Sequence, residues 1–288
     1  MGLVTVVKTT SNQFIRRITN TPNGYLICGD KLTALNFQLE PVYVEEINVI
    51  DWDNIILASN NTIFALEDTL SPIINDKNIT TVCSSGNIVI VGFEGGEIKI
   101  FDNRSEILSL QVHGDDISTL NIYDNIIVSG STDGTVNLMD INELVQLKDF
   151  DSDLVDEYLS ELLTFNVEVS INIAKKYFEY LFVVTDMNQF SIWNLNGEKC
   201  IDFGFIQEYS FNEWKCQSII DVIDERVYSC MQFQEQYALG IFEILQDKLV
   251  FSSISTTTFT DIIRCVCVDE NEVVCCSEDG NIVKMLIE

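Results

Sequence analysis

The sequence is poor in histidine, in basic residues and in proline. Its 288 residues include one histidine, three prolines, and 16 lysines and arginines together. The single histidine, His113, leaves few side chains that could act as a general base near neutral pH. Lysine and arginine side chains are too few to neutralise much phosphate charge. We therefore expect the protein to bind neither nucleic acid directly nor an anionic membrane surface.

Long apolar runs and targeting signals are also missing. No apolar run reaches the about 18 residues that a membrane-spanning helix needs. The first residues, MGLVTVVKTT, have no basic segment before their short apolar run, and Val6 stands where a myristoylation signal has Ser or Thr. These features predict an intracellular protein of the cytoplasm or the nucleus.

The nine cysteines do not have the spacing of a metal centre or of a disulfide scaffold. No CxxC pair occurs. Cys265 and Cys267 share one face of a strand, whereas the adjacent Cys275 and Cys276 point to opposite faces. Because His113 is far away in the sequence, a fourth ligand is missing. We expect reduced cysteines that pack as small apolar residues, with no metal and no cofactor.

Motifs of common enzymes are absent from the sequence. It contains no GxxxxGK[ST] loop, no GxSxG elbow, no HExxH helix and no HxE with PCxxC. We expect no catalytic residues and no enzyme activity. A hydrolase that works with carboxylates alone is the one enzymatic alternative, and it would need two clustered carboxylates in a deep pocket.

A repeated hairpin pattern is what the sequence does contain. In Asn125–Ile141, a β-branched run is followed by Asp133-Gly134, which suits a tight turn, and by a second alternating run. A separation of 38 residues relates both Gly92 to Gly130 and Asp102 to Asp140. The seven copies are Gly24–Leu35, Asn54–Leu66, Asn87–Asp102, Asn125–Ile141, Tyr180–Leu195, Arg226–Glu243 and Glu272–Ile287.

These hairpins resemble the second and third strands of WD40 propeller blades. Trp193 lies in the family's Trp-Asp position, where other copies have Phe101-Asp102 and Met139-Asp140. The resemblance implies an all-β, seven-bladed WD40-like β-propeller, with one domain over residues 1–288; another propeller family is the alternative. Further short strands are expected at Ile117–Ile122 and Glu143–Leu147.

The ends of the chain predict how the propeller closes. The last copy stops at Glu288 without an outer strand, whereas Leu3–Val7 is a spare strand before the first blade. In the WD40 family an N-terminal strand commonly completes the last blade. Closure of this kind removes an open edge.

The resemblance also implies a polar network in blade four. His113, Ser129 or Ser131, and Asp133 match the family's hydrogen-bonded residues. Because Met139 replaces the tryptophan, we expect the network to be incomplete and His113 to be structural.

An acidic helix interrupts the repeat at about residues 151–163, which we place between blades four and five. In Asp151–Leu163, apolar residues recur at helical spacing and acids occupy the first turn. The favoured interpretation is that the apolar stripe packs on the protein's own propeller. The alternative is that Leu154, Tyr158 and Leu162 face a partner.

Acidic residues dominate the composition, with 45 Asp and Glu and a formal net charge of −29. In a WD40 fold the turns inside the hairpins and the loops between blades share one face, so that face is predicted to be acidic. Acidity could also serve solubility alone. The acidic residues that we expect to bind protein are Glu94, Asp115, Asp116, Asp133, Glu278 and Asp279.

Two functions fit these features. The first is a non-enzymatic scaffold, a WD40 subunit of a multiprotein complex that is itself monomeric. The second is an acidic escort for a basic client such as a ribosomal protein or histone. In both cases the expected partners are other proteins with basic surfaces, because opposite fields speed encounter.

Overall fold

The computed structural model describes residues 3–10, 14–53, 56–59, 61–66, 70–147, 152–269 and 271–287. The chain forms two compact units. Unit 1 holds Met1–Val49 and Phe203–Glu288, and unit 2 holds Ile50–Asp202. We describe each unit by itself.

Unit 1 contains three antiparallel sheets, which we call blades one, six and seven. Blade one is β2 (Ile15–Thr21), β3 (Gly24–Gly29), β4 (Leu32–Leu35) and β5 (Pro41–Glu45). Blade six is β22 (Ser210–Phe211), β23 (Trp214–Ile223), β24 (Arg226–Phe233), β25 (Gln236–Leu245) and β26 (Lys248–Ile254), preceded by the short helix η1 (Ile206–Glu208). Blade seven is β27 (Ile263–Asp269), β28 (Glu272–Ser277), β29 (Asn281–Ile287) and β1 (Leu3–Thr10).

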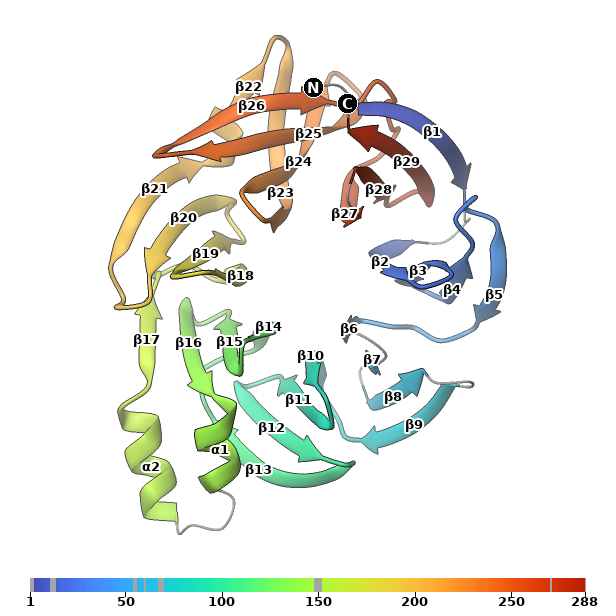
Figure 1. The fold of residues 1–288 in the computed structure, drawn as a ribbon. Coiled ribbons are helices and arrows are strands. Elements are labelled where there is room, and N and C mark those ends of the chain that lie inside the picture. The colour runs from blue at the N-terminus through green and yellow to red at the C-terminus, as the bar shows by residue number, and fades with distance from the viewer. Residues whose placement is uncertain are drawn as a thin grey trace. The chain divides into compact units, whose positions relative to one another are not determined.

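The outermost strand of blade seven comes from the other end of the chain. β1 pairs antiparallel with β29, from Leu3 opposite Ile287 to Thr10 opposite Asn281 (Figure 1). The prediction that an N-terminal strand completes the last blade is therefore confirmed. Without β1, the backbone groups on one edge of β29 would have no strand partner.

Unit 2 contains the four remaining sheets, blades two to five, up to Asp202 in the last strand of blade five. Blade two is β6 (Asp51–Asp53), β7 (Ile56–Ala58), β8 (Thr62–Leu66) and β9 (Leu70–Asn75); blade three is β10 (Ile79–Ser85), β11 (Ile88–Phe93), β12 (Glu97–Asp102) and β13 (Ser105–Gln111). Blade four is β14 (Ile117–Tyr123), β15 (Ile126–Ser131), β16 (Thr135–Asp140) and β17 (Leu163–Asn166). Blade five is β18 (Ile171–Tyr177), β19 (Tyr180–Thr185), β20 (Gln189–Asn194) and β21 (Lys199–Phe205).

The inner strands are continuous apolar runs because each sheet is covered on both faces. Ile127 and Val128 are neighbours on β15, and both are completely buried. Since successive side chains point to opposite faces, Ile127 packs with Ile90 and Ile100 of blade three, whereas Val128 packs with Leu181 and Trp193 of blade five. One strand thus joins two layers of the core.

All seven predicted hairpins are present, and the fold class is confirmed as an all-β, seven-bladed arrangement. Two helices interrupt it: α1 (Ile141–Leu147) and α2 (Ser152–Ser160). Over the residues that the structure describes, no helix is long and apolar enough to cross a membrane.

Two predictions around these helices are wrong. Glu143–Leu147 is part of α1 and not a strand, because Ile141 and Leu144 bury one helical face while the carboxylate of Asp140 accepts a hydrogen bond of 2.7 Å from the Asn142 amide. The helical insertion also lies inside blade four. β17, which follows the helices, pairs with β16, so the insertion separates the third and fourth strands of one blade and not blades four and five.

Candidate protein-interaction site

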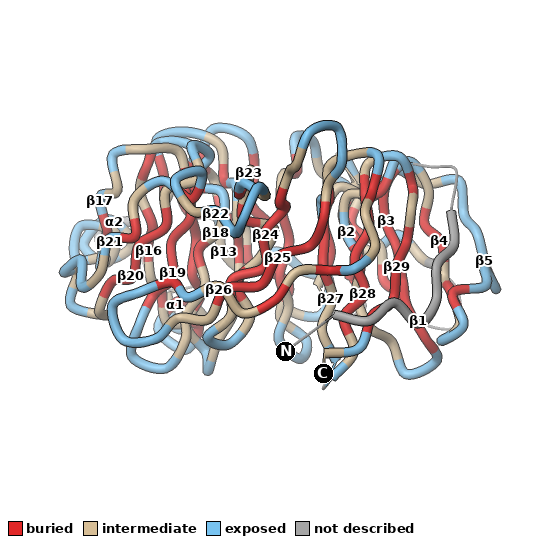
Figure 2. The backbone as a smooth tube through the Cα atoms, turned by 90° about the horizontal axis from the view of Figure 1, so that it is seen from above, coloured by how far each residue is buried: buried red, intermediate tan, exposed pale blue. Residues whose placement is uncertain are grey.

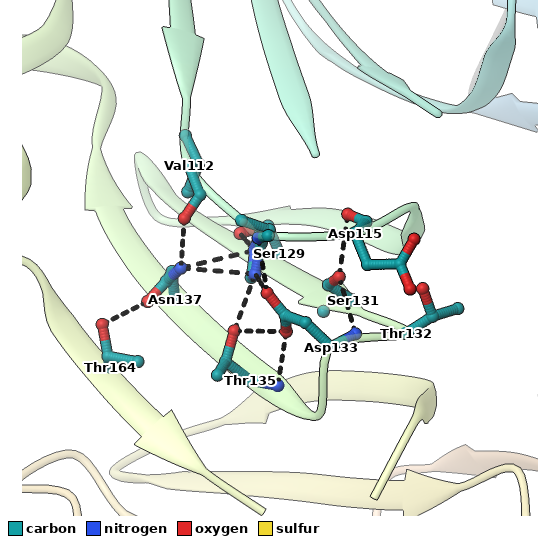
Figure 3. A network of polar contacts seen from close by, with 12 residues as sticks. Val112, Asp115, Ser129, Ser131, Thr132, Asp133, Thr135, Asn137 and Thr164 are labelled. Atoms are coloured by element: carbon teal, nitrogen blue, oxygen red, sulfur yellow. Dashed lines mark hydrogen bonds and ion pairs between the residues drawn. The ribbon is translucent and has the colours of Figure 1, made fainter. Parts of the chain in front are cut away.

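The predicted polar network of blade four is present around His113 (Figure 3). His113 follows β13 and is buried. Its Nε2 atom lies 2.8 Å from Oγ of Ser129 on β15, and its Nδ1 atom lies 2.8 Å from Oγ1 of Thr135 on β16. The ring therefore joins the loop before the blade to both strands of the central hairpin, which is a structural role.

Asp133 is held by the same network. Its Oδ1 atom accepts hydrogen bonds of 2.8 and 2.7 Å from the amide and hydroxyl of Thr135, and its Oδ2 atom accepts one of 2.7 Å from the Gly114 amide. Burial raises the pKa of Asp133, but these hydrogen bonds and His113 outweigh burial and leave the pKa below its ordinary value. Both carboxylate oxygens already have protein partners.

Asn137 and Thr164 extend the network past the position of the missing tryptophan. The Asn137 side-chain amide donates a hydrogen bond of 3.2 Å to the Val112 carbonyl, and its oxygen accepts one of 2.5 Å from Thr164 (Figure 3). Met139 is buried in the apolar core instead. Sequence reasoning missed Asn137 and Thr164, because their contact joins residues 27 apart across the helical insertion.

Blade seven repeats part of this arrangement. Asp279 accepts hydrogen bonds of 2.5 Å from the hydroxyls of Ser277 and Thr260, and these bonds hold its pKa low against the effect of burial. Its neighbour Glu278 forms an ion pair with Arg264. These two predicted binding residues therefore stabilise unit 1 internally.

The predicted acids of unit 2 differ in how far they are engaged. One Asp116 carboxylate oxygen accepts a hydrogen bond of 2.8 Å from the Gly95 amide, and Asp115 accepts one of 2.9 Å from the Asp116 amide. Both Glu94 and Asp115 are exposed, and Asp186, in the equivalent turn of blade five, is exposed as well. Of these four acids of the hairpin turns and loops, Glu94, Asp115 and Asp186 are thus the exposed ones.

The helical insertion places its apolar stripe partly on its own unit. Tyr158 and Leu162, together with Val155, are half-buried against a core cluster that includes Ile141 and Leu144. Leu154 is different, since 42% of it is exposed. Of the three residues that the alternative interpretation turns toward a partner, Tyr158 and Leu162 therefore pack on their own unit, as the favoured interpretation expects. Leu154 does not.

A cleft of about 370 Å³ opens beside these two residues, and we call it the blade-four cleft. Its walls come from the end of α2, from β16 and β17, and from blade five. Its apolar lining is Ile126, Leu138, Met139, Tyr158, Leu162, Leu163 and Leu195. Its polar lining is Asp140, Glu143, Glu161 and Lys176.

The charges around the blade-four cleft are mostly negative. Three carboxylates face one ammonium group, and Lys176 lies 4.0 Å from Asp124 with only 14% of its side chain exposed. Burial and the nearby Glu143 carboxylate raise the pKa of Tyr158 to about 12. The hydroxyl of Tyr158 is therefore neutral at physiological pH, and it is hydrogen-bonded to the backbone of Asp140.

Metal ligation finds no support in the described residues, where no group of three or more His, Cys, Asp or Glu side chains is placed to hold a metal ion. All nine cysteines are free thiols, and seven of them are buried. Burial raises the pKa of Cys267 to about 12 and that of Cys230 to about 11, so these thiols stay protonated.

Known structures show the same fold. Comparison of the sequence with protein-family models and with curated proteins gives no match. The structure is similar to the WD40 propeller domain of Doa1, with 12% identity, a TM-score of 0.68 and coverage of 99% of this chain and 97% of that one. It is similar to the WD40 repeats of RRP9, with 10% identity, a TM-score of 0.75 and coverage of 99% and 100%. A chain of the mitotic checkpoint complex gives 12% identity, a TM-score of 0.72 and coverage of 99% and 95%. The chain thus has the fold of a seven-bladed WD40 propeller, and the resemblance found in the sequence is confirmed for the fold.

Proposed function

We propose that this protein is a non-enzymatic scaffold, a propeller subunit of a multiprotein complex, which binds a partner protein at the blade-four cleft. The observation that carries the proposal is the cleft itself. It depends on the helical insertion of blade four, and it combines an apolar lining with an acidic rim. Fold similarity supports protein binding only in general, because one fold serves many functions.

The lining indicates the chemistry of the partner. An apolar side chain would contact Leu138, Leu162 and Leu163, and its burial would contribute about 25 cal/mol for each Å² removed from water. A neighbouring Lys or Arg would reach Glu143 or Glu161, both of which are exposed. We therefore expect a partner segment with an apolar anchor beside basic residues.

A matched pair of leucines tests this proposal. Leu163 lines the blade-four cleft and is 36% exposed, whereas Leu154 is 42% exposed and does not line it. Leu163→Lys places a like charge against the basic partner, and should remove partners that co-purify with the tagged full chain. Leu154→Lys should retain them. Quantitative mass spectrometry of the two purifications gives the answer, and identical partner sets would contradict the scaffold proposal.

The alternative is an acidic escort for a basic client, which the exposed acids Glu94, Asp115 and Asp186 favour together with the net charge of −29. An escort held by surface charge should release its client at high salt, because salt screens exposed charges. The triple variant Glu94→Lys, Asp115→Lys, Asp186→Lys should release it too, while Leu163→Lys keeps it. The opposite pattern favours the cleft.

A further inference from the structure

The outermost strand of blade one, β5, is exposed along its whole length (Figure 2). Three of its five residues are apolar: Val42 is 66% exposed, Tyr43 is 44% exposed and Val44 is 50% exposed. β-Branched and aromatic residues are those that strands prefer, because they pack well on neighbouring strands. β5 therefore has the composition of a packed strand, but its side chains are exposed to solvent.

Other outermost strands differ from β5 in this respect. Each outermost strand whose side chains the structure describes, apart from β5, buries at least one residue. The buried residues are Ile74 on β9, Leu110 on β13, Phe165 on β17, Phe203 on β21 and Leu249 on β26. The exposure of β5 is therefore a property of this strand and not of outer strands in general.

The backbone of β5 also has a free edge. The sheet order is β2-β3-β4-β5, so β4 is its one strand partner among the described residues. Ala34 pairs with Tyr43 and Leu35 pairs with Pro41, which leaves Val42 as an extra residue in a bulge. Peptide groups that point away from β4 can accept another strand, and natural proteins usually protect such edges with lysines or with a covering segment.

The charges around β5 are mostly negative. Glu40, Glu45 and Glu46 are all exposed at the two ends of the strand. Lys31 forms an ion pair of 2.5 Å with Glu46. The edge is therefore apolar in the middle and acidic at both ends.

We infer that β5 is a docking edge for an extended segment of a partner protein, which adds as a further strand to blade one and carries basic residues toward Glu40 and Glu45. Backbone hydrogen bonds would give affinity, while contacts with Val42 and Val44 would select apolar side chains at alternate positions. The inference rests on the proposed function only in that the ligand is a protein. It concerns unit 1, whereas the blade-four cleft lies in unit 2.

A second copy of this chain fits the edge less well. Antiparallel pairing of β5 with itself about Tyr43 would place Glu45 of each copy opposite Pro41 of the other, and Glu46 opposite Glu40. Like charges directly opposite each other destabilise a strand pair, and each copy carries a net charge of −29. A basic segment removes this repulsion.

The test uses a fluorescent synthetic peptide of eight residues in which Lys and Val alternate, titrated against the full chain. We expect saturable binding, which falls at least about tenfold when alternate peptide nitrogens are methylated, because methylation removes the donors of one edge. Hydrogen exchange of the bound protein should slow at residues 42–46, since Pro41 has no amide proton. Equal binding of the methylated peptide, or no saturable binding of either peptide, would overturn the inference.

A matched pair of valines locates the site. Val44→Lys should weaken peptide binding at least about tenfold, whereas Val250→Lys should not, since Val250 is 42% exposed on β26, the outermost strand of another blade in unit 1. Leu163→Lys should leave peptide binding unchanged even if it removes the cleft partner, so the two proposals fail separately. Equal effects of the two valine variants, or a dimer of the wild-type chain by light scattering that Val44→Lys dissolves, would count against a heterologous partner.

Discussion

Nδ1 of His113 lies 3.5 Å from Oδ2 of Asp133. The imidazole is fully buried and the carboxylate is 20% exposed, so both groups interact in surroundings that contain little water. Burial lowers the pKa of His113, and the attraction of Asp133 opposes this only in part. At neutral pH the ring is therefore neutral and the carboxylate is charged.

His113 should titrate below its ordinary pKa of about 6.5. Because the chain contains one histidine, a single imidazole resonance in the NMR spectrum reports it directly. Asp133→Asn should lower the pKa of His113 further, since it removes the charge that favours the imidazolium. A midpoint above 6.5 in the folded protein, or a rise with Asp133→Asn, would contradict the arrangement in Figure 3.

Acid should weaken the fold through the same histidine. Because the pKa of His113 is lower in the folded state, the unfolded chain takes up the proton first, and stability falls as the pH drops below about 6.5. Stability continues to fall until the pH reaches the pKa of His113 in the folded protein. Acidification also reduces the repulsion of a net charge of −29, so the useful quantity is the difference between the wild type and His113→Asn. The free energy of unfolding at pH 7.5 and 5 should fall more in the wild type; equal changes would exclude this linkage.

Alanine substitutions at two adjacent glycines in the β11–β12 turn should distinguish the cost of backbone strain from the cost of a steric clash. Both have left-handed backbones, with φ of +79° at Gly95 and +89° at Gly96. A Cβ atom on Gly95 would meet nothing within 4 Å, whereas one on Gly96 would lie 2.2 Å from the His113 carbonyl oxygen. Gly95→Ala should cost about 1 kcal/mol of stability, and Gly96→Ala at least about 2 kcal/mol more. Denaturant unfolding measures both, and equal costs would show that the close approach is absent.

The hairpins and the closing strand could be predicted because their signals are local. Asp133-Gly134 and Gly95-Gly96 mark turns between β-branched runs, and Leu3–Val7 was the one spare strand. β1 extends from Leu3 to Thr10, three residues beyond that prediction. Turns and the presence of a strand follow from neighbouring residues, so one sequence is sufficient for them, whereas the exact end of a strand is not fixed in this way.

The insertion and the roles of the acids could not be predicted in the same way. β17 has only four residues, and Glu143–Leu147 is a short, largely apolar run that suits a strand or a helix, so the sequence places the outer strand of blade four where α1 lies. Asp133 and Glu94 look alike in the sequence as acids in hairpin turns. Their difference depends on the Gly114 amide, which the fold brings to Asp133 from 19 residues away.

Thiol reactivity should distinguish one cysteine from the others. Cys200 is exposed, Cys267 is partly buried, and the remaining seven cysteines are buried. Burial raises the pKa of Cys216 and Cys267 to about 12, which suppresses the reactive thiolate. A disulfide reagent should therefore modify one thiol rapidly in the native protein, and Cys200→Ser should abolish this fast phase. Full reaction of all nine thiols would require the denatured chain, and two or more fast thiols in the native protein would contradict the burial of the others.

Deleting the first ten residues should open the edge of β29. β1 pairs with β29 over its whole length, and Ile282, Val283 and Met285 on β29 are completely buried. The shortened chain should therefore melt earlier, by about 2–4 °C for each kcal/mol lost in a protein of this size class, and should associate through its exposed edge. Light scattering and a thermal melt measure both effects. A peptide with the sequence LVTVVKTT, added in trans, should occupy the edge and restore the monomer, whereas the same composition in scrambled order should not. A shortened chain that stays monomeric and melts like the full chain would show that β1 contributes nothing to closing blade seven.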